Sequence, residues 1–213
     1  MKLYGISGLG ADRRVFDYLK LDYEFVPIEW IDPIEGEMLA DYATRLSQTI
    51  DTNEKFGILG VSFGGLVTVE ISKKLHPAIS ILISSAEVYS ELRILYRIIG
   101  QTNLLKFMPS ALFDPPRALA TWVFGAKNKD LLEQILNDTD LKFAKWAVNQ
   151  LLTWKNKERL KTPILKIAGT NDRLIPPSEN GDQVMIEQGA HFMIVDRADE
   201  ISQIINNALK KID

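Results

Sequence analysis

The sequence predicts an α/β fold built on a doubly wound, mostly parallel sheet of about six strands. Apolar runs of strand length alternate with segments whose apolar residues recur at helical spacing, as expected for a sheet covered by helices on both faces. The alternation breaks only between residues 87 and 158, which read as helical and are punctuated by proline and glycine. We therefore expect a core formed by residues 1–86 and 159–213, with residues 87–158 as a helical insertion.

The expected strands, in chain order, are residues 2–7, 23–30, 55–61, 78–86, 163–170 and 182–189. Pro27 interrupts the second of them, and because proline cannot donate to a neighbouring strand, this strand is expected at an edge. Helices are expected at residues 13–20, 38–50, 64–76 and 198–212. The last begins with acids and ends with lysines, which suits the helix dipole.

Composition excludes several classes of function. The formal net charge is −3, which argues against a nucleic-acid partner. The chain has no cysteine and two histidines, so thiol chemistry and a metal site are not expected, and no cofactor is implied. The N-terminal residues lack the length and flanks of a signal peptide, and no apolar stretch suits a membrane span. We expect a cytoplasmic protein that acts on a small molecule.

The segment "GVSFG", from Gly60 to Gly64, has the pattern of a nucleophile elbow, in which a strand turns sharply into a helix and exposes a serine. Gly60 and Gly64 remove side chains that would collide across so tight a turn. A phosphate-binding loop is excluded because Leu66 and Val67 stand where lysine and a hydroxyl residue are needed. A plain glycine-rich turn that exposes Ser62 remains the alternative.

A nucleophilic serine needs a base, and the base needs an orienting acid. His191 follows the sixth expected strand, so its loop lies at the same sheet edge as Ser62. His76 instead lies at the far end of the helix that follows Ser62. Asp172 follows the fifth strand and is the candidate acid, with Glu87 in reserve.

The tetrahedral intermediate of acyl transfer also needs preorganised donors for its oxyanion. The loop after the first strand supplies glycines that let backbone N–H groups approach closely. We expect the N–H groups of Leu9 and Phe63 to be the donors, with Gly8 supporting the loop. Dinucleotide binding is disfavoured there because Arg13 stands where a third glycine is required.

The motifs "SGLGADRRVF", "GVSFGG", "AGTNDRLIP" and "GAHF" together resemble the α/β-hydrolase family over nearly the whole chain outside the insertion. The resemblance implies Ser62 as nucleophile, Asp172 as acid, His191 as base, and strand order 2-1-3-4-5-6. It also implies that residues 87–158 cap the active site. The chain departs from the family where many members have His-Gly in the oxyanion loop and it has Ser7-Gly8. Because the nucleophile is serine and not aspartate, members that open epoxides or displace halide are poor models.

These residues predict a serine hydrolase that cleaves a small to medium, rather apolar carboxylic ester through an acyl-enzyme on Ser62. The same groups would serve thioester or C–C bond hydrolysis, and a cap-lidded binding protein with little turnover is a further alternative. Arg93, Arg97 and Arg117 could recognise an acidic substrate but are expected at the surface. Some large apolar residues of the insertion could line a pocket, although most should pack within it: Tyr89, Leu95, Tyr96, Phe107, Met108, Trp122, Phe124, Phe143, Trp146 and Trp154.

Overall fold

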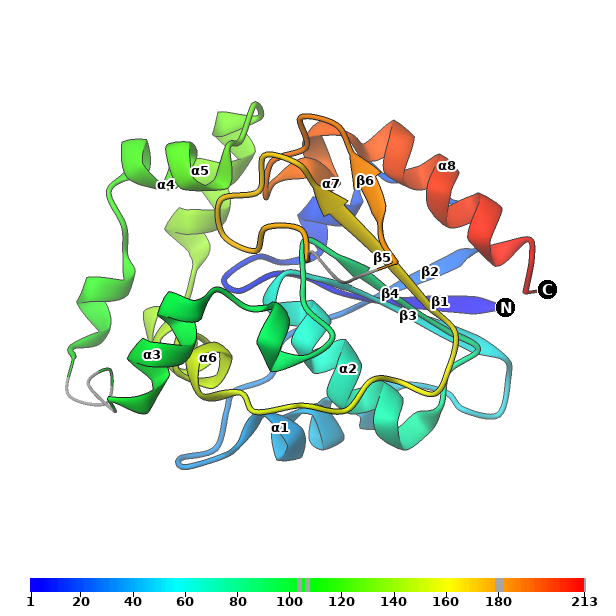
Figure 1. Cartoon of the computed structure of the whole chain (residues 1–213), viewed down its shortest axis with the longest axis horizontal. Coiled ribbons are helices and arrows are strands. Elements are labelled where there is room, and N and C mark those ends of the chain that lie inside the picture. Colours follow the sequence, from blue (N-terminus) through cyan, green and yellow to red (C-terminus); the bar gives the residue numbers. More distant parts are fainter. Residues whose placement is uncertain (103–104, 106–107, 179–181, 213) are drawn as a thin grey trace.

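A computed structural model describes residues 1–102, 105, 108–178 and 182–212. These residues form one six-stranded sheet with the order β2-β1-β3-β4-β5-β6. Every neighbouring pair is parallel. The predicted fold class and strand order are therefore confirmed (Figure 1).

The strands are β1 (Lys2–Ile6), β2 (Glu24–Ile28), β3 (Phe56–Val61), β4 (Ile79–Ile83), β5 (Ile164–Gly169) and β6 (Val184–Ile186). β2 lies at an edge, as Pro27 predicted. β6 is shorter than expected because the chain turns directly after Ile186. Gln188 there has a positive φ of 56°, and the N–H of Gly189 donates back to the Ile186 carbonyl.

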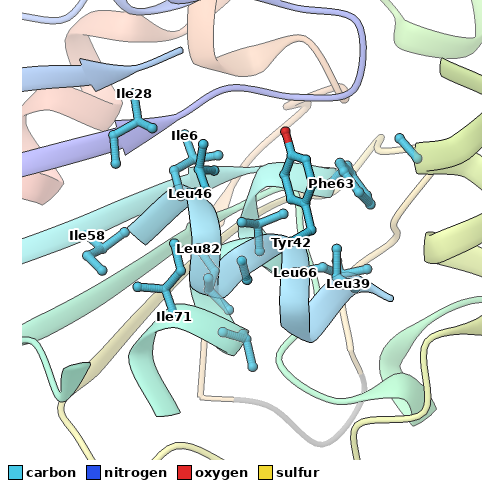
Figure 2. Close-up of a cluster of buried hydrophobic side chains, with 14 of the residues drawn as sticks. Ile6, Ile28, Leu39, Tyr42, Leu46, Ile58, Phe63, Leu66, Ile71 and Leu82 are labelled. Carbon is cyan, nitrogen blue, oxygen red and sulfur yellow. The ribbon is translucent and has the colours of Figure 1, made fainter. Parts of the chain in front are cut away.

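Helices cover both faces of the sheet (Figure 1). α1 (Leu39–Leu46) and α2 (Phe63–Leu75) pack on one face, and α7 (Met193–Asp196) and α8 (Ala198–Leu209) pack on the other. Successive residues of β3 supply opposite faces, because strand side chains alternate: Ile58 joins the cluster under α1 and α2, and Leu59 joins the cluster under α8. Figure 2 shows the first cluster, which includes Tyr42 and Leu46 of α1.

The helix expected at residues 13–20 is wrong in extent, since only a 3₁₀ turn forms at Arg13–Phe16. The following backbone N–H groups bind elsewhere. Lys20 N–H donates to the hydroxyl of Ser202, and Asp22 N–H donates to the side chain of Asn206. These contacts tie the segment to α8, so the helix cannot continue.

The segment between β4 and β5 carries α3 (Ile94–Gln101), α4 (Arg117–Phe124), α5 (Lys129–Asp138) and α6 (Leu141–Thr153). Short 3₁₀ turns lie at Tyr89–Glu91 and Ser110–Phe113, and the described residues of the segment contain no strand. Within the part of the chain that the structure describes, no helix is long and apolar enough to cross a membrane.

A cluster of charged side chains joins the two ends of this insertion to the sheet. The Nζ atom of Lys166 in β5 lies 2.7 Å from a carboxylate oxygen of Glu91, and both side chains are buried. Arg159 binds Glu87 at 2.5 Å and Glu91 at 3.3 Å. Residues that leave the sheet are thus ion-paired with residues that return to it.

Candidate active site

Ser62 lies between the last residue of β3 and the first residue of α2, with φ of 53° and ψ of −121°. A positive φ is rare for a residue with a side chain, and such strain persists only where the surroundings enforce it. A hydrogen bond to the neighbouring strand holds the residue, because Ser62 N–H donates to the Ile83 carbonyl of β4 at 2.9 Å. The turn predicted from "GVSFG" has therefore formed, and Ser62 is partly exposed.

The glycines around Ser62 leave no room for a side chain. A Cβ atom on Gly60 would lie 2.5 Å from the carbonyl oxygen of Gly64. A Cβ atom on Gly64 would lie 2.1 Å from the carbonyl oxygen of Ser7. Both distances are below any real Cβ contact, so α2 can start against β1 and β3 only with glycine at these positions.

Three predicted residues meet at the carboxyl end of the sheet. The Nε2 atom of His191 lies 2.8 Å from the Oγ atom of Ser62. The Nδ1 atom of the same ring lies 2.8 Å from Oδ2 and 3.0 Å from Oδ1 of Asp172. His191 and Asp172 are buried, at 4% exposure each. This geometry gives the serine a base, and gives the base an acid on its other nitrogen.

The loop after β5 holds the carboxylate of Asp172 in place. Its Oδ1 atom accepts hydrogen bonds from the backbone N–H groups of Leu174 and Ile175, both at 2.9 Å. On the other side of the imidazole, the ring of Phe124 meets His191 edge to face, with centroids 5.5 Å apart. The carboxylate and the phenyl ring together restrict how the imidazole can turn.

Two hydrogen bonds to one carbonyl group hold the loop after β1. The oxygen of Ala11 accepts from the Ser7 hydroxyl at 2.7 Å and from Trp30 Nε1 at 2.9 Å. Ser7 therefore holds this loop closed. A Cβ atom on Gly8 would lie 3.5 Å from the Cβ of Ser62, so the loop passes directly beside the serine.

The two expected oxyanion donors are next to residues at the turn: Phe63 follows Ser62 in the chain, and Leu9 follows Gly8, which lies beside Ser62. Phe63 is the first residue of α2, where backbone N–H groups have no partner within the helix. Neither N–H group donates a hydrogen bond to another described residue, so both are available to a bound oxygen.

The other titratable candidates lie elsewhere. His76 caps the far end of α2 and is exposed. Glu87 is buried, where it accepts from the N–H of Leu160 at 2.9 Å and pairs with Arg159. Its carboxylate serves the charged cluster at the base of the insertion.

The large apolar residues of the insertion lie in different environments. Phe143 and Trp154 are buried in the cluster beneath α1 and α2, and Tyr89, Tyr96 and Trp146 pack against that cluster. Leu95 and Trp122 are exposed. Met108 is partly buried, and Phe107 lies outside the described residues.

A groove with a volume of about 1280 Å³ runs beside α6. Arg97, Trp146 and Trp154 are among the residues that line it, whereas Ser62, Asp172 and His191 are not. The groove and the serine site are therefore distinct.

The two remaining arginine candidates have partners of their own. Arg93 donates to the Leu174 carbonyl at 3.2 Å, and Arg117 pairs with Asp114 at 2.6 Å.

Three contacts at the site carry no signal in the sequence. Trp30 stands in the segment after the edge strand, Phe124 ends a helix of the insertion, and Ser85 follows β4 and donates to the Ser62 carbonyl at 2.6 Å. None of them belongs to a spaced motif. Their roles depend on the way separate loops meet, which only the folded chain shows.

No protein-family model matches the sequence, and no curated protein matches it. Solved structures do match its fold. A thermophilic esterase is 19% identical, with a TM-score of 0.74, over 99% of this chain and 90% of that chain. MenH from S. aureus is 19% identical, with a TM-score of 0.72, over 100% and 94%. The hydrolase olei00960 from Oleispira antarctica is 15% identical, with a TM-score of 0.76, over 98% and 90%. At such identities the similarity establishes the α/β-hydrolase fold.

Proposed function

We propose that this chain, which has the α/β-hydrolase fold, is a serine hydrolase that cleaves a small to medium, rather apolar carboxylic ester. One observation carries the proposal: the hydrogen-bonded series from Ser62 through His191 to Asp172, with both heavy-atom links at 2.8 Å. Similar solved structures, among them a thermophilic esterase and a hydrolase, support the reaction class.

The proposed reaction is acyl transfer to water. Ser62 Oγ attacks the ester carbonyl while His191 Nε2 accepts its proton, and Asp172 holds the opposite N–H and stabilises the imidazolium. The N–H groups of Leu9 and Phe63 stabilise the oxyanion of the tetrahedral intermediate. His191 then protonates the departing alcohol. Water, deprotonated by His191, attacks the acyl-enzyme, and Ser62 recovers its proton as the acid leaves.

Apolar surroundings support an uncharged acyl group. Phe124 packs against the His191 ring, and Phe63, beside the serine, packs against Trp30 with ring centroids 5.9 Å apart. Two arginines at the Asp172 loop are already engaged: Arg93 donates to the Leu174 carbonyl, and Arg173 donates to the Trp122 carbonyl at 2.6 Å. A free charge for an acidic substrate is therefore not evident among these residues.

The proposal includes residues 87–158 as a cap over the core formed by residues 1–86 and 159–213. In addition to the packing of Phe124 on His191, two hydrogen bonds support this cap. The Phe192 N–H, next to His191, donates to the Phe124 carbonyl at 3.1 Å. Thr139, at the end of α5, donates to the Gly10 carbonyl at 3.0 Å, which lies in the oxyanion loop. The insertion would thus control access to Ser62.

A panel of p-nitrophenyl esters with rising acyl length, beside matching acyl thioesters, tests the reaction class. We expect turnover of the shorter apolar esters that is lost in Ser62→Ala and His191→Ala and kept in His76→Ala, the matched control. Turnover confined to thioesters would move the proposal to that substrate class. Undiminished turnover in Ser62→Ala would overturn it, and binding without turnover would favour the binding protein.

A further inference from the structure

Ser85, the second residue after β4, hydrogen-bonds to the backbone of Ser62. Its hydroxyl donates to the Ser62 carbonyl oxygen at 2.6 Å. The same oxygen accepts from the N–H of Gly65 at 2.9 Å. The carbonyl of the candidate nucleophile is thus held by one donor from its own turn and one from the neighbouring strand end.

Three local features place Ser85 at this position. Val61 and Ile83 are paired at the ends of β3 and β4, so Ser62 and Ser84 leave the sheet side by side. Ser84 is fully buried and has a φ of 49°, so the chain bends sharply there, in a conformation that residues with side chains rarely adopt. A Cβ atom on Gly65 would lie 2.1 Å from the Ser85 hydroxyl oxygen, so only glycine at 65 admits it.

The carbonyl of Ser62 and the N–H of Phe63 belong to one planar peptide group. No peptide bond of the described chain is cis, so these two groups point in opposite directions. A donor that fixes the direction of the Ser62 carbonyl therefore also fixes the direction of the Phe63 N–H. Hydrogen bonds accepted by a carbonyl also polarise its amide, which makes the N–H a stronger donor.

We infer that Ser85 is a positioning residue that aims the Phe63 N–H at the oxyanion. The inference rests on the proposed function, since it assigns Ser85 a part in that reaction. Ser85 acts through the peptide group and does not touch the substrate. Its contribution should therefore be greatest when negative charge has formed on the substrate oxygen, and small when an uncharged ligand is bound.

The test compares Ser85→Ala with Ser80→Ala, because Ser80 in β4 also donates a buried hydroxyl, to Ser72 at 2.8 Å, but pairs with Ile58 in β3, four residues before Ser62. Steady-state kinetics on the best ester are combined with affinities for two inhibitors. A trifluoromethyl ketone forms a tetrahedral adduct with an oxyanion. An alkyl ether of the same length binds without one.

Loss of a whole oxyanion donor lowers kcat about 10²- to 10³-fold. Ser85→Ala keeps the Phe63 N–H and removes only the hydrogen bond that orients it, so we expect kcat to fall about tenfold with KM nearly unchanged. Affinity for the trifluoromethyl ketone should fall by the same factor, and affinity for the ether should not change. Ser80→Ala should lower the melting temperature and leave kcat, KM and both affinities unchanged. If Ser85→Ala does not fold, Ser85→Cys, a weaker donor of similar size, should give the same pattern with a smaller loss.

Equal losses of affinity for both inhibitors, or unchanged kcat in a folded Ser85 variant, would overturn the inference. The wild-type protein separates this failure from that of the proposed function. If wild type hydrolyses the ester and Ser85→Ala matches it, the inference alone is wrong. If wild type neither hydrolyses esters nor forms the ketone adduct, the proposed function is wrong.

Discussion

His191 Nε2 lies 2.8 Å from Ser62 Oγ, although 129 residues separate them along the chain. The parallel sheet produces this contact, because all its strands end at one edge and their loops meet there. Ser62 leaves β3, Asp172 leaves β5, and His191 follows β6. The following predictions test what this arrangement does and what holds it together.

Asp172→Asn should nearly abolish activity while the protein stays folded. The asparagine oxygen can still accept the N–H groups of Leu174 and Ile175, so the turn survives. Its NH₂ group would donate to His191 Nδ1 and leave the proton on Nε2, where the base must be free. We expect kcat to fall about 10³- to 10⁴-fold, with an unchanged circular dichroism spectrum. A loss under tenfold would show that Asp172 does not orient the base.

Gly64→Ala should destabilise the fold strongly, because its Cβ atom would lie 2.1 Å from the Ser7 carbonyl oxygen. We expect a loss of about 3 kcal/mol in the free energy of unfolding, at the upper end for overpacking. Gly36→Ala is the control, since no atom lies within 4 Å of its Cβ position; unlike Gly64, Gly36 has a positive φ, of 77°. It should cost about 1 kcal/mol. Equal losses in urea denaturation would contradict the steric account.

Lys166→Met should cost about 3 kcal/mol of stability, because it leaves the buried carboxylate of Glu91 with only its longer contact to Arg159, at 3.3 Å. The Glu91 side chain is only 6% exposed, and Lys166 lies 2.7 Å from it. Lys20→Met is the matched control, since its ion pair with Asp199 is exposed at 78% and 75%. That variant should stay within about 1 kcal/mol of wild type. A similar loss in both variants would mean that the buried cluster does not join the insertion to the sheet as described.

Tyr42 should make the protein less stable in alkaline solution. Burial raises the pKa of its hydroxyl to about 12, and that hydroxyl donates to the Ile31 carbonyl at 2.8 Å. In the unfolded chain the pKa is about 10, so between these values the unfolded state binds fewer protons and stability falls as pH rises. Urea titrations from pH 9 to 12 should show a shallower fall in Tyr42→Phe. Identical slopes would contradict the assignment.

Much of the fold was predictable because it depends on local patterns. Alternating apolar runs predict the strands, and Pro27 predicts the edge position of β2. The extents of the elements were harder. Residues 17–20 have helical spacing, yet Lys20 N–H binds Ser202 of the last helix instead. No local pattern anticipates a partner 182 residues away.

The sequence likewise predicts some residues of the candidate site and not others. Ser62, Asp172 and His191 were found because turn glycines and chain order mark them, and their proposed roles stay predictions until the reaction is measured. Ser85 was not found, because a serine after a strand has no distinguishing spacing. Its contact depends on the bend at Ser84 and on the missing side chain of Gly65, which come together only in three dimensions.

The most direct test of the account is the reaction of the purified protein with a fluorophosphonate probe, followed by peptide mass spectrometry. Attack by an activated Ser62 displaces fluoride and leaves a stable phosphonyl ester. The account predicts one adduct per chain on Ser62, lost in His191→Ala and kept in His76→Ala. An unlabelled Ser62 in the folded wild-type protein, or labelling that survives His191→Ala at the same rate, would contradict it.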